Sequence, residues 1–317
     1  MMKKIRYIIS LLIIFMMLLA ADIGGGRSMV VLDAGMLVFG LLCTDRLPWK
    51  TDRLHAIILI AAAAFGGTAI QALMPGPVYF KILAAFAFAG ILIVLTDCKF
   101  MSVFSVCLAP VMFGNSSVSY PVMATAVIFA VCIAWHVLVR IGAKEEAIKF
   151  RYLPDFERDM RIWLVMIIAM AVMAVYPAWW NKLAYIYPPL ITIFTEGCYR
   201  DLKGKRLRIL FVTVVSAVAG AMTEFFLSGI FGMPMCISAM IAVGITMLEM
   251  RLMSMPFAPI CSVALVPFAV DVDFFEFPIM TAIGCTVILI VSAIINSRLR
   301  NSKGKGKHAV KYHGDME

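Results

Sequence analysis

Residues 82–102 read ILAAFAFAGILIVLTDCKFMS, a long apolar run that ends in a short cationic tetrapeptide. Residues 239–254 read AMIAVGITMLEMRLMS and end in a closely related tetrapeptide. An apolar run of about 20 residues can cross a bilayer as a single helix. The recurrence of both the run and its ending predicts a helical membrane protein built by tandem duplication.

Further anchors match at nearly constant spacing along the chain. The matched pairs are Arg6 with Arg161, Cys43 with Cys198, and Pro121 with Pro278. The small drift in spacing falls in expected loops, where insertions are tolerated. These anchors predict a first membrane repeat at 1–142, a connector at 143–160, a second repeat at 161–297 and a basic tail at 298–317.

Composition places the chain among polytopic membrane proteins. Hydrophobic residues make up 63% of it, charged residues only 15%, and the mean hydropathy is +0.96, which is more apolar surface than one soluble core can bury. We therefore expect an all-α transmembrane bundle of about twelve segments in two parallel six-segment repeats. The expected segments are 5–22, 28–44, 54–74, 79–97, 100–114, 121–142, 161–179, 183–197, 208–229, 233–249, 252–269 and 275–297. Whether 28–44, 100–114 and 183–197 are long enough to span the membrane stays open.

Basic residues sort to one side under this scheme. With the N-terminus inside, every Lys and Arg except Arg27, Lys81 and Lys182 falls on the inner side. The net charge of +9 then needs no nucleic-acid partner. We expect a plasma or inner membrane location with both termini cytoplasmic. The apolar start resembles a signal peptide, but its repeat counterpart lies mid-chain, so we expect a retained helix.

No motif for catalysis or metal binding is visible. The eight cysteines are scattered without a Cys-x-x-Cys pair, and no nucleotide-binding loop or nucleophile–base pattern occurs. We therefore expect no enzyme activity, no cofactor and no metal.

Four polar residues within the apolar segments are the first candidates for a site, because such groups are costly in lipid and often line a pathway. They are Glu224, Asp33, Gln71 and His136. Aligning Gly67 with Gly220 sets Gln71 opposite Glu224, so Glu224 is the leading candidate for a proton- or substrate-binding group. Local hydrogen bonding of Glu224 and simple packing of His136 are the competing interpretations.

Prolines and charged pairs mark the segment ends. Pro256 and Pro259 predict a broken helix, which often lines a transport path, although a kinked packing helix is the alternative. The neighbours Glu249 and Arg251 predict an interfacial ion pair at the inner membrane surface.

One family resemblance emerges from the order of short motifs in each copy. Tyr185-Ile186-Tyr187-Pro188-Pro189 precedes an apolar segment, a basic loop with Arg206 and Arg208, and a small-residue helix at 216–220. In the first copy, Arg46, Lys50 and Arg53 precede the small residues at 61–67. This pattern resembles the fusaric acid resistance and aromatic acid exporter superfamily, whose membrane module has six helices. A second family, named for a His-Pro-Pro motif, shows a similar layout around 255–259.

The resemblance implies export of small organic acids, including aromatic ones, through a path between the repeats, with proton coupling as one energy source. A passive anion channel of the same architecture and a non-transporting membrane scaffold are the alternatives. The implied partners are the lipid bilayer, a small organic anion, and either further copies of the chain or a periplasmic adaptor.

Overall fold

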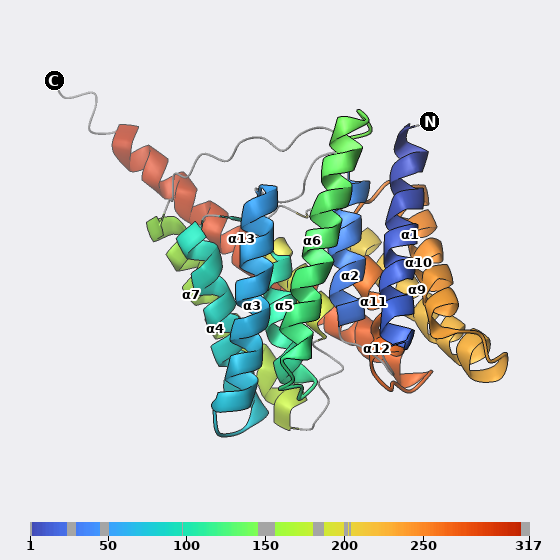
Figure 1. Cartoon of the computed structure of the whole chain (residues 1–317). Helices are drawn as coiled ribbons and strands as arrows, with labels where there is room; N and C mark the ends of the chain where they lie inside the picture. Colours follow the sequence, from blue (N-terminus) through green and yellow to red (C-terminus); the bar gives the residue numbers. More distant parts are fainter. Residues whose placement is uncertain are drawn as a thin grey trace.

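The chain folds into a bundle in which all regular elements of the described residues are helices (Figure 1). The structure, a computed structural model, describes residues 2–23, 30–44, 51–96, 98–144, 156–179, 187–199, 202 and 204–311. Within these ranges the elements form two kinds, long helices at the periphery and short helices in the interior.

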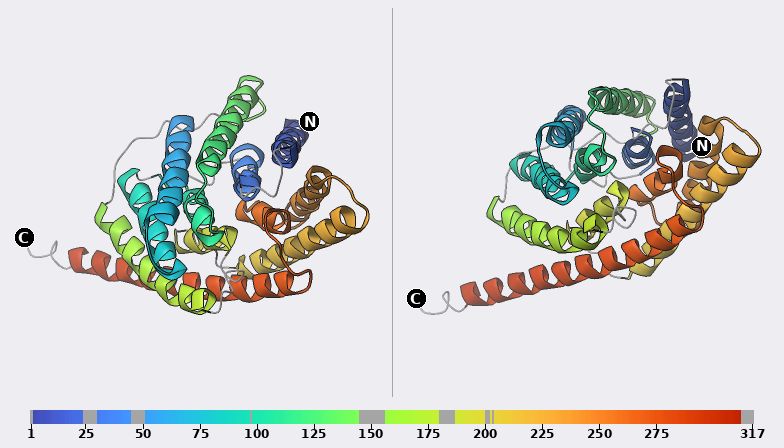
Figure 2. Two further views of the ribbon diagram at one scale, coloured as in Figure 1. Left: turned by 60° about the horizontal axis from the view of Figure 1, so that its bottom comes forward. Right: turned by 90° about the horizontal axis from the view of Figure 1, so that it is seen from below.

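The long helices correspond to the longer apolar segments of the sequence. They are α1 (Met2–Ile23), α3 (Arg53–Leu73), α4 (Val78–Thr96), α6 (Ser119–Arg140), α7 (Phe156–Trp179), α9 (Arg206–Met222) with its π-helical continuation η3 (Thr223–Ile230), α10 (Met235–Leu252) and α13 (Glu276–Lys311). Figure 2 shows α13 running along one side of the bundle and extending beyond it. Residues 298–311, expected in a tail, thus continue this helix.

Four short segments form the interior. They are α2 (Val30–Val38) with the π-helix η1 (Phe39–Cys43), α5 (Ser102–Met112), α8 (Pro188–Tyr199), and the pair α11 (Pro259–Val263) and α12 (Val266–Ala269). Every residue of α5, α11 and α12 is buried, as are residues 32–43 and 188–198. Packing joins them in a closed order: α2 contacts α5, α5 contacts α8, α8 contacts α11, and α11 contacts α2. We call this set the inner ring.

The prolines explain why the inner segments are short. Pro188 and Pro189 begin α8, a position where the missing N–H is no loss. The single expected segment at 252–269 is instead divided: α10 ends at Leu252, an irregular stretch contains Pro256, and Pro259 begins α11. Pro267 is the second residue of the separate turn α12, which begins at Val266.

The outward faces of the long helices are apolar. On α1 the exposed residues Ile8, Leu12 and Met16 recur every four positions, and α7 and α13 carry similar stripes. A continuous apolar exterior around a closed helical interior is what a bilayer requires, because lipid offers no hydrogen-bond partners. By length and composition, six helices in the described part of the chain are candidates to cross a membrane. These properties fit a multi-pass membrane protein.

Two joints at the periphery connect helices α1–α6 to helices α7–α13. At one joint α4 packs against α7, and at the other α1 packs against α10. Tyr79 of α4 donates a hydrogen bond to the carbonyl of Ala171 on α7, at 3.0 Å. The inner ring adds further contacts of the same kind, of α5 with α8 and of α2 with α11 and α12.

Candidate functional site

Asp33 lies in the inner ring with no solvent exposure. It occupies the first turn of α2, where the helix dipole favours a carboxylate. Ser105 of α5 donates a hydrogen bond to its Oδ1 at 3.1 Å, and the Tyr120 hydroxyl of α6 lies 2.7 Å from its Oδ2. Three helices therefore converge on one buried carboxyl group.

The Tyr120 hydroxyl has two acceptors and one proton. Besides Asp33, it lies 2.9 Å from the carbonyl oxygen of Val106 on α5. A phenol can donate only one hydrogen bond, although it can also accept. When the carboxyl is ionised, Tyr120 donates to it. When the carboxyl carries a proton, Asp33 can donate to Tyr120 and Tyr120 to Val106. The geometry thus accommodates both protonation states of Asp33.

A second buried acid was missed by the sequence reasoning. Glu196 of α8 is 1% exposed and belongs to the inner ring. The signal was available, since Glu196 lies within the apolar segment expected at 183–197.

The residues favoured from sequence occupy the long helices instead. Glu224 lies in η3 and is half-buried beside the exposed rings of Phe225 and Phe226. Gln71 is also half-buried near the end of α3; its Oε1 is shielded without a hydrogen bond, and its carbonyl accepts from Lys81 Nζ at 3.1 Å. Of the four polar candidates from the sequence, only Asp33 is fully buried.

His136 and the two prolines lie near the opposite end of the bundle. His136 is exposed on α6, and its Nδ1 is 2.7 Å from Arg53 Nη1. Pro259 is buried at the start of α11, whereas Pro256 is exposed and lines a cavity.

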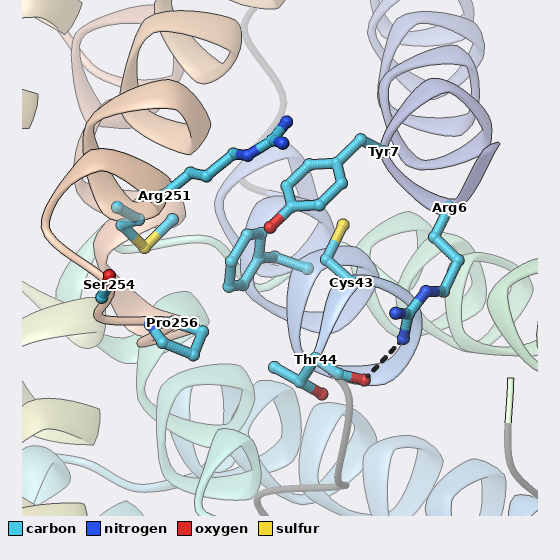
Figure 3. Close-up of a pocket in the computed structure, with 9 residues that line it drawn as sticks. Arg6, Tyr7, Cys43, Thr44, Arg251, Ser254 and Pro256 are labelled. Atoms are coloured by element: carbon cyan, nitrogen blue, oxygen red, sulfur yellow. Dashed lines mark hydrogen bonds between the residues drawn. The ribbon is translucent and has the colours of Figure 1, made fainter. Parts of the chain in front are cut away.

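This cavity lies at the joint between α1 and α10 and has a volume of about 370 Å³ (Figure 3). It is lined by Arg6, Tyr7, Phe39, Cys43, Thr44, Met250, Arg251, Ser254 and Pro256. In Figure 3, Arg6 and Arg251 reach it from α1 and α10, with Tyr7 and Cys43 between them. Its size is within the roughly 300–1,000 Å³ typical of small-molecule sites.

Local contacts hold the cavity wall. Arg6 is only 5% exposed, and its Nη1 donates to the carbonyl of Thr44 at 3.4 Å. The Cys43 thiol donates to Ser10 Oγ at 3.0 Å, which ties η1 to α1. The predicted ion pair of Glu249 with Arg251 is wrong: Glu249 accepts a hydrogen bond from Ser216 at 3.3 Å, and Arg251 lines the cavity.

The other joint is filled with aromatic rings. Trp163 of α7 stacks on Phe86 of α4, with ring centroids 5.1 Å apart, and Phe104 of α5 packs against both. Phe194 of α8 completes the cluster. Gly90 leaves space for the indole, since a Cβ there would lie 2.0 Å from the Trp163 ring.

Metal binding has no visible site among the residues that the structure describes, since no group of three or more His, Cys, Asp or Glu is placed to hold an ion. Comparison of the chain with protein-family models, with curated proteins and with solved structures gives no match. The functional argument therefore depends on the arrangement of the residues themselves.

Proposed function

We propose that this chain is a membrane transporter that exports small organic acids through a path between its two repeats. The observation that carries the proposal is the Asp33 carboxyl, sealed within the inner ring and hydrogen-bonded by Ser105 and Tyr120. An ionisable group inside a membrane domain is costly, and in transporters it commonly binds a proton or substrate. A scaffold would have no use for it.

The packing supports a two-repeat architecture. Contact of α4 with α7 is matched by contact of α10 with α1, and α5 with α8 by α11 with α2. A two-fold relation between the repeats produces such reciprocal pairs. Two glycines support the same relation: a Cβ on Gly67 would lie 2.0 Å from the carbonyl oxygen of Cys107, and one on Gly220 would lie 2.3 Å from that of Ala264.

Charge supports the orientation. Arg53 begins α3, Arg140 ends α6 and Arg251 is in the last turn of α10, and Figure 1 shows these helix ends on the side of the bundle where the chain begins. Asp271 and Asp273 lie in the connection at the other end. By the positive-inside rule, this charge distribution supports a cytoplasmic N-terminus. Reporter fusions should read an inner location at 45–53 and an outer one at 75–78; the reverse would overturn the orientation.

Asp33 is assigned the proton-coupling role in preference to Glu224. Its two hydrogen-bonding arrangements differ in whether Tyr120 donates to Asp33 or to Val106. Protonation of Asp33 therefore turns the Tyr120 hydroxyl of α6 from a donor to Asp33 of α2 into a donor to Val106 of α5. Such a local switch is what coupling of proton transfer to helix movement requires.

The test is uptake of an organic acid into proteoliposomes across a range of pH. We expect flux driven by a proton gradient in the wild type, its loss in Asp33→Asn, and little change in Glu224→Gln. Asp271→Asn is the matched control, since it makes the same chemical change in an exposed loop. Flux that persists in Asp33→Asn and ignores pH would favour the alternative, a passive anion channel. The absence of flux under every condition would favour the remaining alternative, a non-transporting membrane scaffold.

The family assignment remains part of the proposal. The two-module layout supports a relation to the fusaric acid resistance and aromatic acid exporter superfamily, and with it an organic anion as substrate. A periplasmic adaptor or further copies of the chain are the partners that this assignment implies. Crosslinking in intact cells would identify either one.

A further inference from the structure

Three nitrogen-rich side chains meet where α3 begins against the side of α6. Arg53, the first residue of α3, donates from Nη1 to Nδ1 of His136 on α6 at 2.7 Å. The Arg53 guanidinium also lies over the buried Trp135 ring, 5.3 Å from its centroid, which helps to hold it in place. Arg140 lies one helical turn beyond His136 on the same face of α6. We call Arg53, His136 and Arg140 the α3–α6 shelf.

The α3–α6 shelf forms a step in the side of the bundle. Helix α6 continues past the start of α3, on the side where the chain begins (Figure 1). The Cys132 thiol donates to the carbonyl of Arg53 at 3.7 Å, so the end of α6, from His136 to Arg140, extends beyond α3. Both of these side chains are exposed. Side chains on a helix lean towards its N-terminus, so Arg140 covers the turn that carries His136.

The side chains of the α3–α6 shelf offer hydrogen-bond donors. A guanidinium can only donate, so His136 accepts from Arg53 through Nδ1 and carries its proton on Nε2. The Nε2–H is then a donor, as are the remaining N–H groups of Arg53 and those of Arg140. Arg140 makes no hydrogen bond or ion pair with any residue that the structure describes. An anion rich in acceptor oxygens is the complement of such a surface.

The neighbouring acid, Asp52, is directed elsewhere. Asp52 caps α3, and its Oδ1 accepts from the His55 backbone N–H at 2.8 Å and lies 2.7 Å from His55 Nδ1. Within the described ranges, its one ion pair is with this histidine. Arg53 and Arg140 therefore lack a carboxylate partner among the described residues, and their charge is available to a ligand.

An exposed apolar stripe leads away from the α3–α6 shelf along α6. Phe129 and Ile133 are 56% and 51% exposed, and with His136 and Arg140 they recur at helical spacing on one face. This face changes from apolar to cationic within about two helical turns. Such a change matches the boundary between the acyl chains and the headgroups of a bilayer, where basic side chains meet lipid phosphates.

The second repeat does not reproduce the α3–α6 shelf. Arg206 begins α9 as Arg53 begins α3. On α13, however, the spacing between the repeats sets Ala293 and Ser297 at the places of the histidine and the second arginine. We therefore expect one site in each chain, and the second repeat provides matched controls.

We propose that the α3–α6 shelf binds one anionic phospholipid. Its phosphate accepts from Arg140 and from the Nε2–H of His136, next to the positive charge of Arg53, and an acyl chain lies along Phe129 and Ile133. A phosphodiester supplies both the negative charge and the acceptor oxygens that complement these donors. Binding of this lipid requires neither the proposed transport function nor the proposed orientation.

The experiment measures lipid binding to the purified full chain by native mass spectrometry, with phosphatidylglycerol or phosphatidylcholine added to the detergent solution. We expect one tightly bound phosphatidylglycerol per chain. Arg140→Gln should weaken its binding by about tenfold or more, because a charged hydrogen bond is lost. Arg208→Gln is the matched control, since Arg208 is an exposed arginine in the first turn of α9. Arg140 is exposed, so its replacement should not impair folding.

Three results would overturn the proposal. Phosphatidylcholine that bound as tightly as phosphatidylglycerol would show that the net charge of the headgroup is irrelevant. Equal weakening by Arg140→Gln and Arg208→Gln would attribute binding to the general positive charge of this side of the bundle. Displacement of the lipid by inorganic phosphate at equal concentration would assign the α3–α6 shelf to a free anion, because the acyl chain would then contribute nothing.

Fluorescence quenching tests where the lipid lies. Ile133 on α6 and Ile290 on α13 occupy matched positions and are 51% and 55% exposed, and the eight native cysteines are buried. Ile133→Cys or Ile290→Cys therefore adds one accessible thiol for a fluorophore. The labelled chains are placed in phosphatidylcholine nanodiscs that contain a small share of phosphatidylglycerol with brominated acyl chains.

We expect stronger quenching of the fluorophore at residue 133 than at residue 290. Adding Arg140→Gln should make the two equal. Equal quenching at both positions without Arg140→Gln would refute the site, and so would a difference that Arg140→Gln leaves unchanged. Either result is independent of the transport assay, so failure of this site and failure of the proposed function are distinguishable.

Discussion

Replacing Gly67 by alanine tests the closest helix contact in the structure. Gly67 lies on α3 against α5, where a Cβ would be 2.0 Å from the carbonyl oxygen of Cys107 and 2.8 Å from its carbonyl carbon. Both atoms belong to the backbone, so no side chain can rotate away. The two helices must therefore separate by more than an ångström to accept one methyl group.

The cost follows from overpacking. Inserting a group into a well-packed interior typically destabilises a protein by about 1–3 kcal/mol. Gly244→Ala is the matched control, because a Cβ there meets nothing within 4 Å, and alanine favours a helix over glycine by about 0.8–1 kcal/mol. Gly67 also lies within a helix, so the propensity gain is common to both variants and they should differ by the overpacking cost alone, about 1–3 kcal/mol in stability. At roughly 2 °C per kcal/mol for a large domain, their melting temperatures should differ by about 2–6 °C.

The chain provides its own reporter for this measurement. All eight cysteines are buried, so a thiol-reactive fluorogenic dye becomes fluorescent only as the protein unfolds. Melting is recorded in one detergent at one heating rate, because unfolding of membrane proteins is seldom reversible. Gly220→Ala should show a smaller effect than Gly67→Ala, since its contact, Ala264, lies in the turn between α11 and α12. Equal melting of Gly67→Ala and Gly244→Ala would refute the α3–α5 contact.

Three further predictions use the same melting assay. Tyr120→Phe should lower stability by about 1–3 kcal/mol, because the buried acceptors on Asp33 and Val106 lose the single hydroxyl donor that they share; an unchanged melting temperature would contradict the buried network. Gly90→Ala should destabilise the wild type but not Trp163→Ala, since the indole that a Cβ would strike is then absent, and additive effects would contradict that contact. Hydrogen bonds from the backbone N–H groups of Glu276 and Phe275 hold the pKa of Asp273 below its ordinary 3.8. Ionised Asp273 therefore stabilises the start of α13 above pH 3.8, and this contribution is lost as the pH falls through the lowered pKa. Asp273→Ala should therefore melt below the wild type at neutral pH and approach it in acid; a constant difference would contradict this.

The helices of the fold were largely predictable because membrane-length apolar runs are a strong local signal. The segment expected at 208–229 is α9 with η3 at 206–230, and the short segments at 28–44 and 100–114 are α2 with η1 and α5. Their place in the interior was not predictable. Residues that face lipid and residues that face other helices are both apolar, so the sequence pattern does not distinguish them. Only the contacts between distant helices determine which segments lie in the interior.

The candidate site was predictable only in part. Asp33 was recognised as an ionisable residue within an apolar segment. Its hydrogen-bond partners Ser105 and Tyr120 are far away in sequence, and no local pattern predicts them. Aligning Gln71 with Glu224 favoured Glu224, but such an alignment does not tell which side of a helix faces inward. The cavity escaped notice because Arg251 was paired with its neighbour Glu249 rather than with a distant helix.

The short length of the inner helices also bears on the distance over which a membrane potential would fall. The eleven residues of α5 rise about 17 Å, roughly half the hydrocarbon core of a bilayer. In a membrane, water that reached both ends of the inner ring would leave the whole potential to fall across that distance. A charge crossing it would do work of about 2.3 kcal/mol per 100 mV within a few helical turns. The field at Asp33 would then be nearly twice that in the surrounding lipid.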